Sequence, residues 1–373
     1  MLIKNVLVFT EDKQFVPGEI AIENGKFVKE CKTENQVIDG KGCYAVPGFI
    51  DVHFHGCMGE DFSDGSEKAI ETIAKYQAAH GITAIVPATM TLPEEDLMKI
   101  METAGRYQGT EDGAILAGIN MEGPFISPNK KGAQAADHIV SPDIQMFQRL
   151  QKASKNMIRL VDIAPEEKGA MEFIQELKDK VHISFAHTVA DYDTAKKGYD
   201  LGACHATHLY NAMPPFTHRA PGVIGAAFDS PQCMAELICD GVHIHPSAVR
   251  AAFALFGDDR IVMISDSMRA AGMPDGQYTL GGQAVAVKGK EATLVSDGAL
   301  AGSVTNLMDC VRTAVKEMNI PLESAVACAS MNPAKSVGIY DQHGSITEGK
   351  IGNVVLLNHD LELEAVILKG KKL

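Results

Sequence analysis

The feature that most restricts the fold of this chain is a set of eight apolar runs, separated from one another by amphipathic segments. Such runs are typical of parallel strands buried on both faces, and the segments between them are typical of covering helices. Eight strands alternating with helices over roughly 220 residues favour an α/β fold of the (β/α)8 TIM-like barrel class over a doubly wound sheet. The runs are residues 45–56, 82–90, 114–123, 158–166, 181–188, 204–211, 235–245 and 261–268.

Several of the intervening segments carry helix boundary signals. Asp191 precedes a helical pattern that stops at Gly202. Ser141-Pro142 predicts another helix start, with the serine as N-cap residue and the proline in the first turn. These signals place helices between consecutive strands, as a (β/α)8 barrel requires.

The two ends of the chain follow another pattern. Short strand signals separated by turn residues fill residues 1–45, and residues 344–373 are again rich in them. We expect residues 1–45 and 337–373 to pair into one small β-sandwich domain beside a barrel domain of residues 46–336. Within the barrel, residues 276–300 alternate between apolar and polar positions and predict an inserted β-hairpin.

The charge balance limits the partners. The chain has 34 basic and 48 acidic side chains, a formal net charge of −14. Nucleic acids and anionic membranes bind clustered lysine and arginine, so neither is expected as a partner, whereas a small anionic ligand needs only one or two cations. The eight cysteines include no C-x-x-C pair. Because the first residues also do not resemble a signal peptide and no long apolar run occurs, we expect a cytoplasmic protein.

Side chains that bind metals or transfer protons gather at the carboxyl ends of the predicted strands. In (β/α)8 barrels these ends form the rim that carries the active site. We therefore expect the side chains to converge on one site. The residues are His53, His55, Glu122, His187, His208, His243 and Asp266.

His53 and His55 end the first predicted strand and are two residues apart, so both imidazoles project from one face. Neutral imidazole is a common ligand of zinc and similar metals. A histidine pair of this spacing also occurs at polar strand ends that bind no metal. Its position at the end of the first strand, before Gly56, favours metal ligation.

Glu122, His187 and His208 supply a second set of potential ligands. The two histidines follow consecutive strands, so we expect them to be neighbours in space. Taken singly, each histidine is compatible with a structural hydrogen bond and Glu122 with a helix cap. Together they favour a metal site in which Glu122 is a ligand, bridging if two metals bind.

Asp266 is the acid in the terminal segment of the eighth predicted strand, and no basic side chain lies close to it in the chain until Arg269. We assign it as general base and then general acid. Capping of the next loop is the alternative.

Longer motifs identify a family. PGFIDVHFHG, MEGPF, THLYNAM, GVHIHP and ISDSM, with GSITEGKIGNVVLLN near the end, resemble the amidohydrolase superfamily and, within it, the N-acetylglucosamine-6-phosphate deacetylases. The resemblance spans nearly the whole chain. It implies metal ligation by Glu122, His187 and His208 at one site. The retained His53 and His55 imply a second site, with Glu122 bridging.

The resemblance also implies the substrate contacts and the catalytic aspartate. Some family members place a histidine after MEGPF to polarise the amide carbonyl, whereas this chain has Gln134 there. A glutamine donates a hydrogen bond but carries no charge, and a second metal could supply the missing polarisation. The implied residues are Asp266 for catalysis, Asn211, the backbone of Ala212 and Arg219 for the phosphate, and His243 for the sugar.

The implied activity is hydrolysis of N-acetylglucosamine 6-phosphate to glucosamine 6-phosphate and acetate. One or two divalent metals per subunit would generate the attacking hydroxide, with zinc favoured and iron, manganese or cobalt open. The implied assembly is a homodimer, and the implied partner is a small phosphorylated amino sugar.

Two other functions remain open. Another amidohydrolase would act on a cyclic amide, a dipeptide or an N-acyl amino acid. Such enzymes commonly bridge their metals with a carboxylated lysine after the fourth strand, whereas Lys168 lies well past that strand end. A non-catalytic scaffold of the same fold would lack ligands that this chain retains, so the metal content of the purified protein separates scaffold from enzyme.

Overall fold

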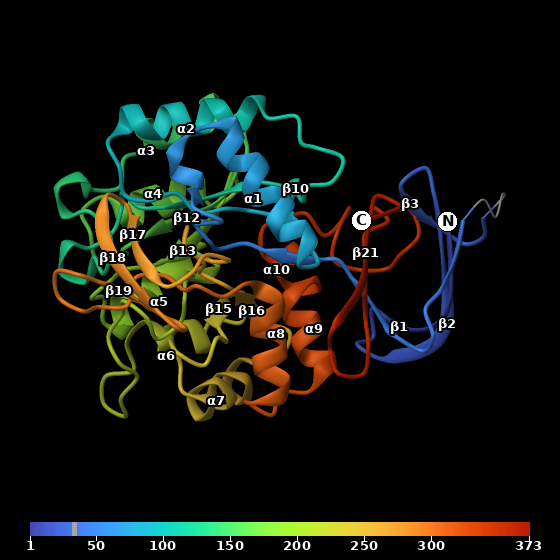
Figure 1. The fold of residues 1–373 in the computed structure, drawn as a ribbon. Helices are drawn as coiled ribbons and strands as arrows, with labels where there is room; N and C mark the ends of the chain where they lie inside the picture. The colour runs from blue at the N-terminus through green and yellow to red at the C-terminus, as the bar shows by residue number, and fades with distance from the viewer. Residues whose placement is uncertain (32–35) are drawn as a thin grey trace.

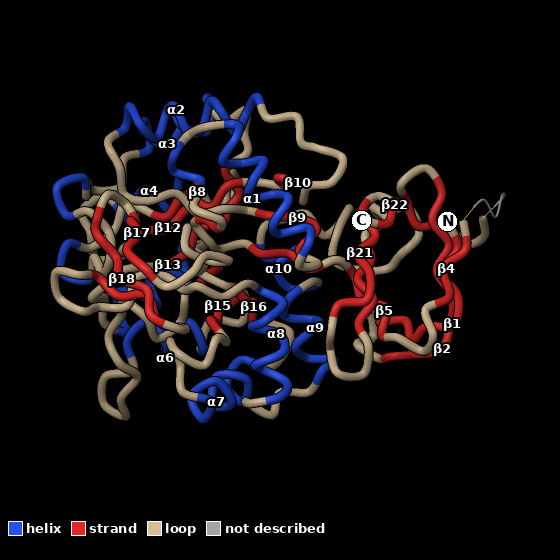
Figure 2. Tube along the Cα trace, viewed as in Figure 1, coloured by secondary structure: helices blue, strands red, loops and turns tan. Residues whose placement is uncertain are grey.

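The computed structural model of this chain describes residues 1–31 and 36–373. It contains a larger mixed α/β unit beside a smaller unit of strands, and both chain ends lie in the smaller unit (Figure 1). In the larger unit, helices lie above and below a core of strands in the view of Figure 2.

The core of the larger unit is a curled parallel sheet whose strands follow in chain order. Strands β11 to β16 form one segment and β6, β9 and β10 form another, and a bridge between Ala88 and Asn120 connects the two. Where the last strand meets the first, the Asp266 amide donates to the His53 carbonyl at 2.9 Å. The sheet thereby curls into a barrel-like domain. Its strands are β6 (Phe49–Asp51), β9 (Ile82–Ile85), β10 (Ile115–Leu116), β11 (Ile119–Glu122), β12 (Ile158–Ile163), β13 (His182–Phe185), β14 (His205–Ala206), β15 (Met234–Ile238) and β16 (Ile261–Ile264).

The helices pack apolar faces on this sheet. In α1, Ile70, Ile73 and Ala74 are buried at helical spacing, and the Ser66 side chain caps the first turn. No helix within the described ranges is long and apolar enough to cross a bilayer. The helices are α1 (Glu67–Ala79), α2 (Glu94–Arg106), α3 (Ile144–Ala153), α4 (Ala170–Leu177), α5 (Tyr192–Leu201), α6 (Gly222–Phe228), α7 (Pro246–Phe256), α8 (Leu307–Lys316), α9 (Leu322–Ala329) and α10 (Met331–Ser336), with 3-10 turns η1 (Phe62–Asp64), η2 (Pro128–Lys130) and η3 (Ala136–His138).

Helix α3 begins later than the sequence predicts. Its N-cap is Asp143 rather than Ser141, and the Asp143 carboxylate accepts from the Gln145 and Met146 amides at 2.8 and 3.1 Å. A carboxylate that satisfies two free amides and also faces the positive end of the helix dipole is a stronger cap than a serine hydroxyl here.

The smaller unit is an eight-stranded sheet to which both ends of the chain contribute. Strand β20 pairs antiparallel with β5, with Val355 opposite Val46, and β5 in turn pairs with β1. Ile3, Ile20 and Ile367 are buried together in its core. The strands are β1 (Leu2–Phe9), β2 (Phe15–Glu23), β3 (Lys26–Val28), β4 (Val37–Asp39), β5 (Tyr44–Pro47), β20 (Val354–Leu357), β21 (Leu363–Leu368) and β22 (Lys371–Lys372).

Residues 276–294 form three antiparallel strands, one more than a hairpin has. The third strand continues the apolar alternation, and its Ala292 and Leu294 are buried together with Met90 of the larger unit. The three strands are β17 (Gly276–Leu280), β18 (Gln283–Lys288) and β19 (Glu291–Leu294), and a separate short hairpin consists of β7 (Gly56–Cys57) and β8 (Glu60–Asp61).

Candidate metal centre and active site

The polar side chains expected at the strand ends meet at one rim of the curled sheet. Glu122 is the last residue of β11, and His53, His187, His208 and Asp266 each lie two residues past the end of their strand. All five residues therefore lie at the carboxyl ends of parallel strands, which meet at one edge of the sheet. All five side chains are buried.

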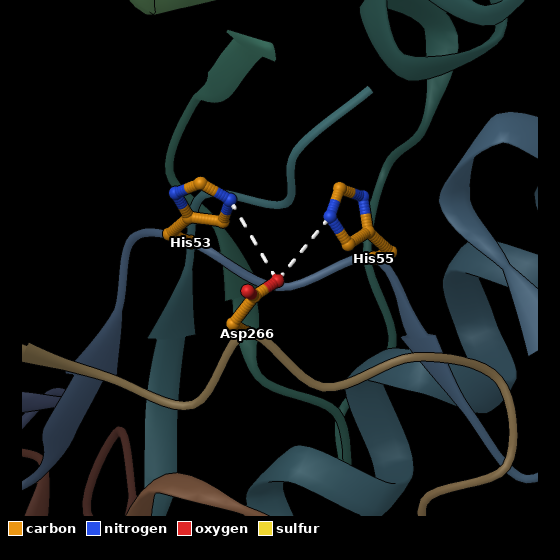
Figure 3. A group of neighbouring side chains, drawn as sticks. All are labelled: His53, His55 and Asp266. Carbon is orange, nitrogen blue, oxygen red and sulfur yellow. Dashed lines mark ion pairs between the residues drawn. The ribbon is translucent and has the colours of Figure 1, made fainter. Parts of the chain in front are cut away.

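The first group of side chains joins the ends of the first and last strands. Nε2 of His53 lies 3.8 Å, and Nε2 of His55 lies 3.4 Å, from Oδ1 of Asp266. Figure 3 shows the two rings directed at this one carboxylate oxygen. The three residues are close enough to hold one metal ion together.

The second group lies beside the first and shares Glu122 with it. Oε1 of Glu122 is 3.0 Å from Nε2 of His187 and 3.3 Å from Nε2 of His208. The same oxygen is 3.5 Å from Nε2 of His53, while Oε2 is 3.3 Å from Nε2 of His55. Glu122 therefore faces both groups, as a bridging ligand would.

The hydrogen bonds of the rings fit metal ligation. Nδ1 of His187 lies 2.9 Å from the Lys130 carbonyl oxygen, and Nδ1 of His208 lies 3.1 Å from that of Asn211. A carbonyl oxygen only accepts, so Nδ1 of each ring carries a proton and Nε2 is the nitrogen left to bind a metal ion. These two nitrogens are 3.2 Å apart and both face Glu122 Oε1, an arrangement that favours a cation among them. Imidazole nitrogen with carboxylate oxygen is a donor set of divalent transition metals.

The two groups open onto a cavity of about 490 Å³. Four of the predicted substrate residues line it, namely Gln134, Asn211, Ala212 and His243. Arg219 is not among the lining residues and is exposed to solvent. The lysine side chains that line the cavity are Lys130 and Lys131.

Gln134 lines the cavity, but both ends of its amide group are engaged within the chain. Its Nε2 donates to Oε2 of Glu122 at 2.8 Å, and its Oε1 accepts from the Thr91 amide at 2.7 Å. In this arrangement Gln134 orients the Glu122 carboxylate, and that hydrogen bond uses one of the two N–H groups on its Nε2.

His243 is held in place by the acid that precedes it on the same loop. Its Nδ1 lies 2.7 Å from Oδ2 of Asp240, whose Oδ1 accepts from the Val242 and His243 amides. Burial lowers the pKa of His243, but the Asp240 carboxylate outweighs this effect and raises that pKa above its usual value. The other ring nitrogen, Nε2, is therefore the one available to a ligand.

Burial and neighbouring charge act in opposite directions on the carboxylates of the centre. Burial raises the pKa of Glu122, but His53 and His187 outweigh it, and the pKa lies well below the usual range. The pKa of Asp266 is likewise lowered against burial by its hydrogen bond with His55 and the charge of His53. Both carboxylates are therefore ionised at neutral pH, as a ligand and a general base must be.

Three acids near the centre were missed by reasoning from the sequence. Glu236 lies in the middle of β15, Asp240 follows it, and Asp162 in β12 stands in register beside Glu122. Burial raises the pKa of Asp162 well above its usual range. The available signal was the presence of Asp162 and Glu236 inside the apolar segments LVDI and AELIC, because acids are rarely buried without a partner.

Three residues of the centre have strained backbones. The φ angles of His187, His208 and Asp266 are 45°, 32° and 49°. A non-glycine residue in this region costs on the order of 1–3 kcal/mol and is retained where the surrounding structure holds it. Each strained residue lies two residues past the end of its strand, and its side chain points into the centre.

Comparison with known proteins places this geometry in a family. The model of the Amidohydrolase family matches residues 44–373. The N-acetylglucosamine-6-phosphate deacetylase of Bacillus subtilis is 36% identical, over 99% of this chain and 96% of that protein. The N-acetylgalactosamine-6-phosphate deacetylase of Escherichia coli O157:H7 is 34% identical, over 87% of this chain and 86% of that protein. A mutant N-acetyl-D-glucosamine-6-phosphate deacetylase of Mycobacterium smegmatis, solved in complex with N-acetyl-D-glucosamine-6-phosphate, superposes with a TM-score of 0.92 at 32% identity, covering 100% of this chain and 98% of that one.

Proposed function

The chain belongs to the amidohydrolase family, among the N-acetylglucosamine-6-phosphate deacetylases, and we propose that it hydrolyses the acetamide of N-acetylglucosamine 6-phosphate. The products are glucosamine 6-phosphate and acetate. The observation that carries the proposal is the pair of ligand groups that share Glu122 and open, beside Asp266, onto one cavity.

Five residues would hold the metal in this proposal. Glu122, His187 and His208 form one site, and His53 and His55 form a second with Glu122 between them. A divalent metal supplies Lewis acidity toward water and the acetamide carbonyl. Zinc is favoured by the nitrogen and oxygen donors, and iron, manganese or cobalt are compatible with the same set.

Asp266 is the proton-transfer group of the proposed reaction. Its ionised carboxylate stands at the cavity wall, where it takes a proton from the water that attacks the acetamide carbon. When the carbon–nitrogen bond breaks, Asp266 returns the proton to the amine that leaves. Gln134 fixes Glu122 with one N–H of its amide and would offer the second to the acetamide carbonyl, which a metal would also polarise.

The remaining lining residues orient the sugar. His243, with its ring fixed by Asp240, presents Nε2 to the sugar, while Asn211 and the backbone of Ala212 lie next to the histidine ligands. Confinement of the amide carbon between these contacts and Asp266 positions it for attack.

We propose that Arg219 binds the phosphate, because the segment that contains it matches the family motif. Because Arg219 is exposed and Lys131 lines the cavity, R219A and K131A together decide which cation binds the phosphate. We expect R219A to raise KM for the phosphorylated sugar and to leave KM for N-acetylglucosamine unchanged, since a guanidinium pairs with phosphate through two hydrogen bonds. A phosphate-specific effect in K131A alone would instead assign the role to Lys131.

The finer architecture follows the same resemblance. We propose that the curled sheet is a (β/α)8 barrel of residues 46–336, and that the sheet of both termini, residues 1–45 and 337–373, is a small β-sandwich. A homodimer and a cytoplasmic location complete the proposal, the latter supported by eight free cysteines.

An assay with matched sugars tests the function. Acetate release would be measured for the N-acetylated glucosamine and galactosamine, each with and without the 6-phosphate, alongside elemental analysis of the protein. We expect bound divalent metal and the highest kcat/KM for N-acetylglucosamine 6-phosphate. Cyclic amides, dipeptides and N-acyl amino acids would be assayed in parallel for hydrolysis, and activity confined to them would replace this proposal with another amidohydrolase function. A metal-free, inactive protein would indicate a scaffold.

A further inference from the structure

The four histidines of the proposed centre have different partners at their outer ring nitrogens. Nδ1 of His187 and of His208 each face a backbone carbonyl, and Nδ1 of His55 has no hydrogen-bond partner in the described part of the chain. Nδ1 of His53 lies 2.9 Å from Oε2 of Glu236. His53 is therefore the histidine of this set whose ring is held by a carboxylate.

The same carboxylate oxygen also serves the second ligand group. Oε2 of Glu236 accepts the His208 amide at 3.0 Å, and the Glu236 carbonyl accepts the Leu209 amide at 2.9 Å. His208 has the strained φ of 32°, and these two hydrogen bonds hold the chain in that conformation. His53 and His208 belong to different ligand groups, so Glu236 connects the two.

Resting on the proposed metal centre, we propose that Glu236 is its positioning residue, which fixes the His53 ring and the His208 backbone through one carboxylate oxygen. The carboxylate keeps the proton on Nδ1 of His53 and leaves Nε2 as the metal-binding atom. That Nε2 has no hydrogen-bond partner among the described residues and lies 3.5 Å from Oε1 of Glu122.

Packing alone does not account for an acid at this position. Glu236 is 0% exposed, in a strand whose neighbouring Ala235 and Leu237 are equally buried. Its Oε1 has no hydrogen-bond partner in the described structure, and Nδ1 of His205 is 3.7 Å away from it. A buried carboxylate is costly unless its contacts compensate, and an apolar side chain would serve the strand better. An anionic partner, by contrast, makes a histidine a stronger ligand, an effect typically of 10- to 100-fold in metal affinity.

Two variants of Glu236 and one matched control test the proposal. E236Q keeps the shape and removes the charge, while E236M has a similar size and accepts no hydrogen bond. D240N is the control, because Asp240 follows on the same segment and also holds a histidine, His243, outside the metal groups. The measurements are the Kd for Zn²⁺ by chelator competition, the thermal midpoint in excess chelator, and KM at saturating zinc.

We expect E236Q to raise the Kd for Zn²⁺ about 10- to 100-fold, and E236M to raise it further. The thermal midpoint of E236Q in chelator and its KM at saturating zinc should stay near the wild-type values, whereas D240N should raise KM and leave the Kd unchanged. Wild-type zinc affinity in both Glu236 variants overturns the proposal, as does an equal loss of affinity in D240N. Wild-type protein that binds none of zinc, iron, manganese and cobalt overturns the metal centre itself and the role of Glu236 with it.

Discussion

At the scale of single residues, chemistry at the centre depends on which atom of a side chain is left free. The Asp266 amide donates to the His53 carbonyl, and its own carbonyl accepts from the Ser303 amide at 2.7 Å. Both backbone groups are thus occupied, and the positive φ of 49° turns the carboxylate toward the cavity. The backbone of Asp266 therefore directs its carboxylate into the cavity.

Replacing Asp266 by asparagine tests its role. D266N keeps the shape but removes the proton acceptor, so we expect kcat to fall by about 10²- to 10⁴-fold. The metal ion proposed for Glu122, His187 and His208 should be retained, because these three ligands are untouched. Steady-state kinetics and elemental analysis of the same preparation provide the check. A D266N variant with near wild-type turnover would show that another group moves the proton.

At the scale of elements, the positions of the helices are decided by their first turns. Asp191 caps α5 and Gly202 ends it, as the sequence predicts. In α3 the sequence offers two candidate caps, Ser141 and Asp143, and the later one is used because its carboxylate reaches two amides. The helix then buries Met146, Phe147 and Leu150.

Loss of this cap should weaken α3 by a predictable amount. D143A leaves the Gln145 and Met146 amides without their acceptor, and we expect the free energy of unfolding to fall by about 1 kcal/mol. D143N retains a side-chain oxygen and should lose only a part of this. Urea denaturation of the three proteins measures the difference. Equal stability of D143A and wild type would mean that Ser141 takes over the cap.

At the scale of the whole molecule, side chains from the two ends of the chain meet at a junction beside the terminal sheet. Tyr340 donates to Glu11 Oε1 at 2.6 Å, and Nζ of Lys350 lies 3.3 Å from the centroid of the Tyr340 ring. His343 is buried close by, and its carbonyl accepts from Lys350. Residues from both chain ends therefore meet at this junction.

The junction makes stability depend on pH. Burial lowers the pKa of His343 from 6.5 to about 4, and the charges of Lys350 and Lys369 add to the effect. Between these values the unfolded chain binds the proton more readily than the folded one. The stability that the neutral His343 contributes is therefore complete above pH 6.5 and is lost progressively as the pH falls from 6.5 to 4. A shift of this size corresponds to about 3 kcal/mol.

The H343Q variant should therefore lose less stability on acidification than wild type. The free energy of unfolding of each protein is measured by urea denaturation at pH 7 and at pH 4.5, and the difference gives its slope against pH. Excess chelator is present at both pH values to remove metal effects. His205, whose pKa burial also lowers to about 4, titrates in the same window, so the slope should shrink rather than vanish. The exposed His218 provides the control variant H218Q, and an unchanged slope in H343Q would contradict the assignment.

The sequence by itself was sufficient to predict the order of strands and helices and most of the centre. Apolar runs mark buried strands, and the residue that follows a parallel strand is confined to one edge of the sheet. His53, His55, Glu122, His187, His208 and Asp266 could therefore be expected at one rim, and the structure brings them together.

Only the tertiary structure decided which side chains hold these residues in place. Glu236 is 183 positions from His53 in the chain, and the two meet because the sheet curls until its last strands reach its first. The bond between Gln134 and Glu122 and the exposed position of Arg219 likewise depend on how loops fold over the rim. The periodicity of the sequence predicts which way a side chain points from its own strand or helix. Which residue that side chain meets is decided by the closure of the sheet and by the path of the loops.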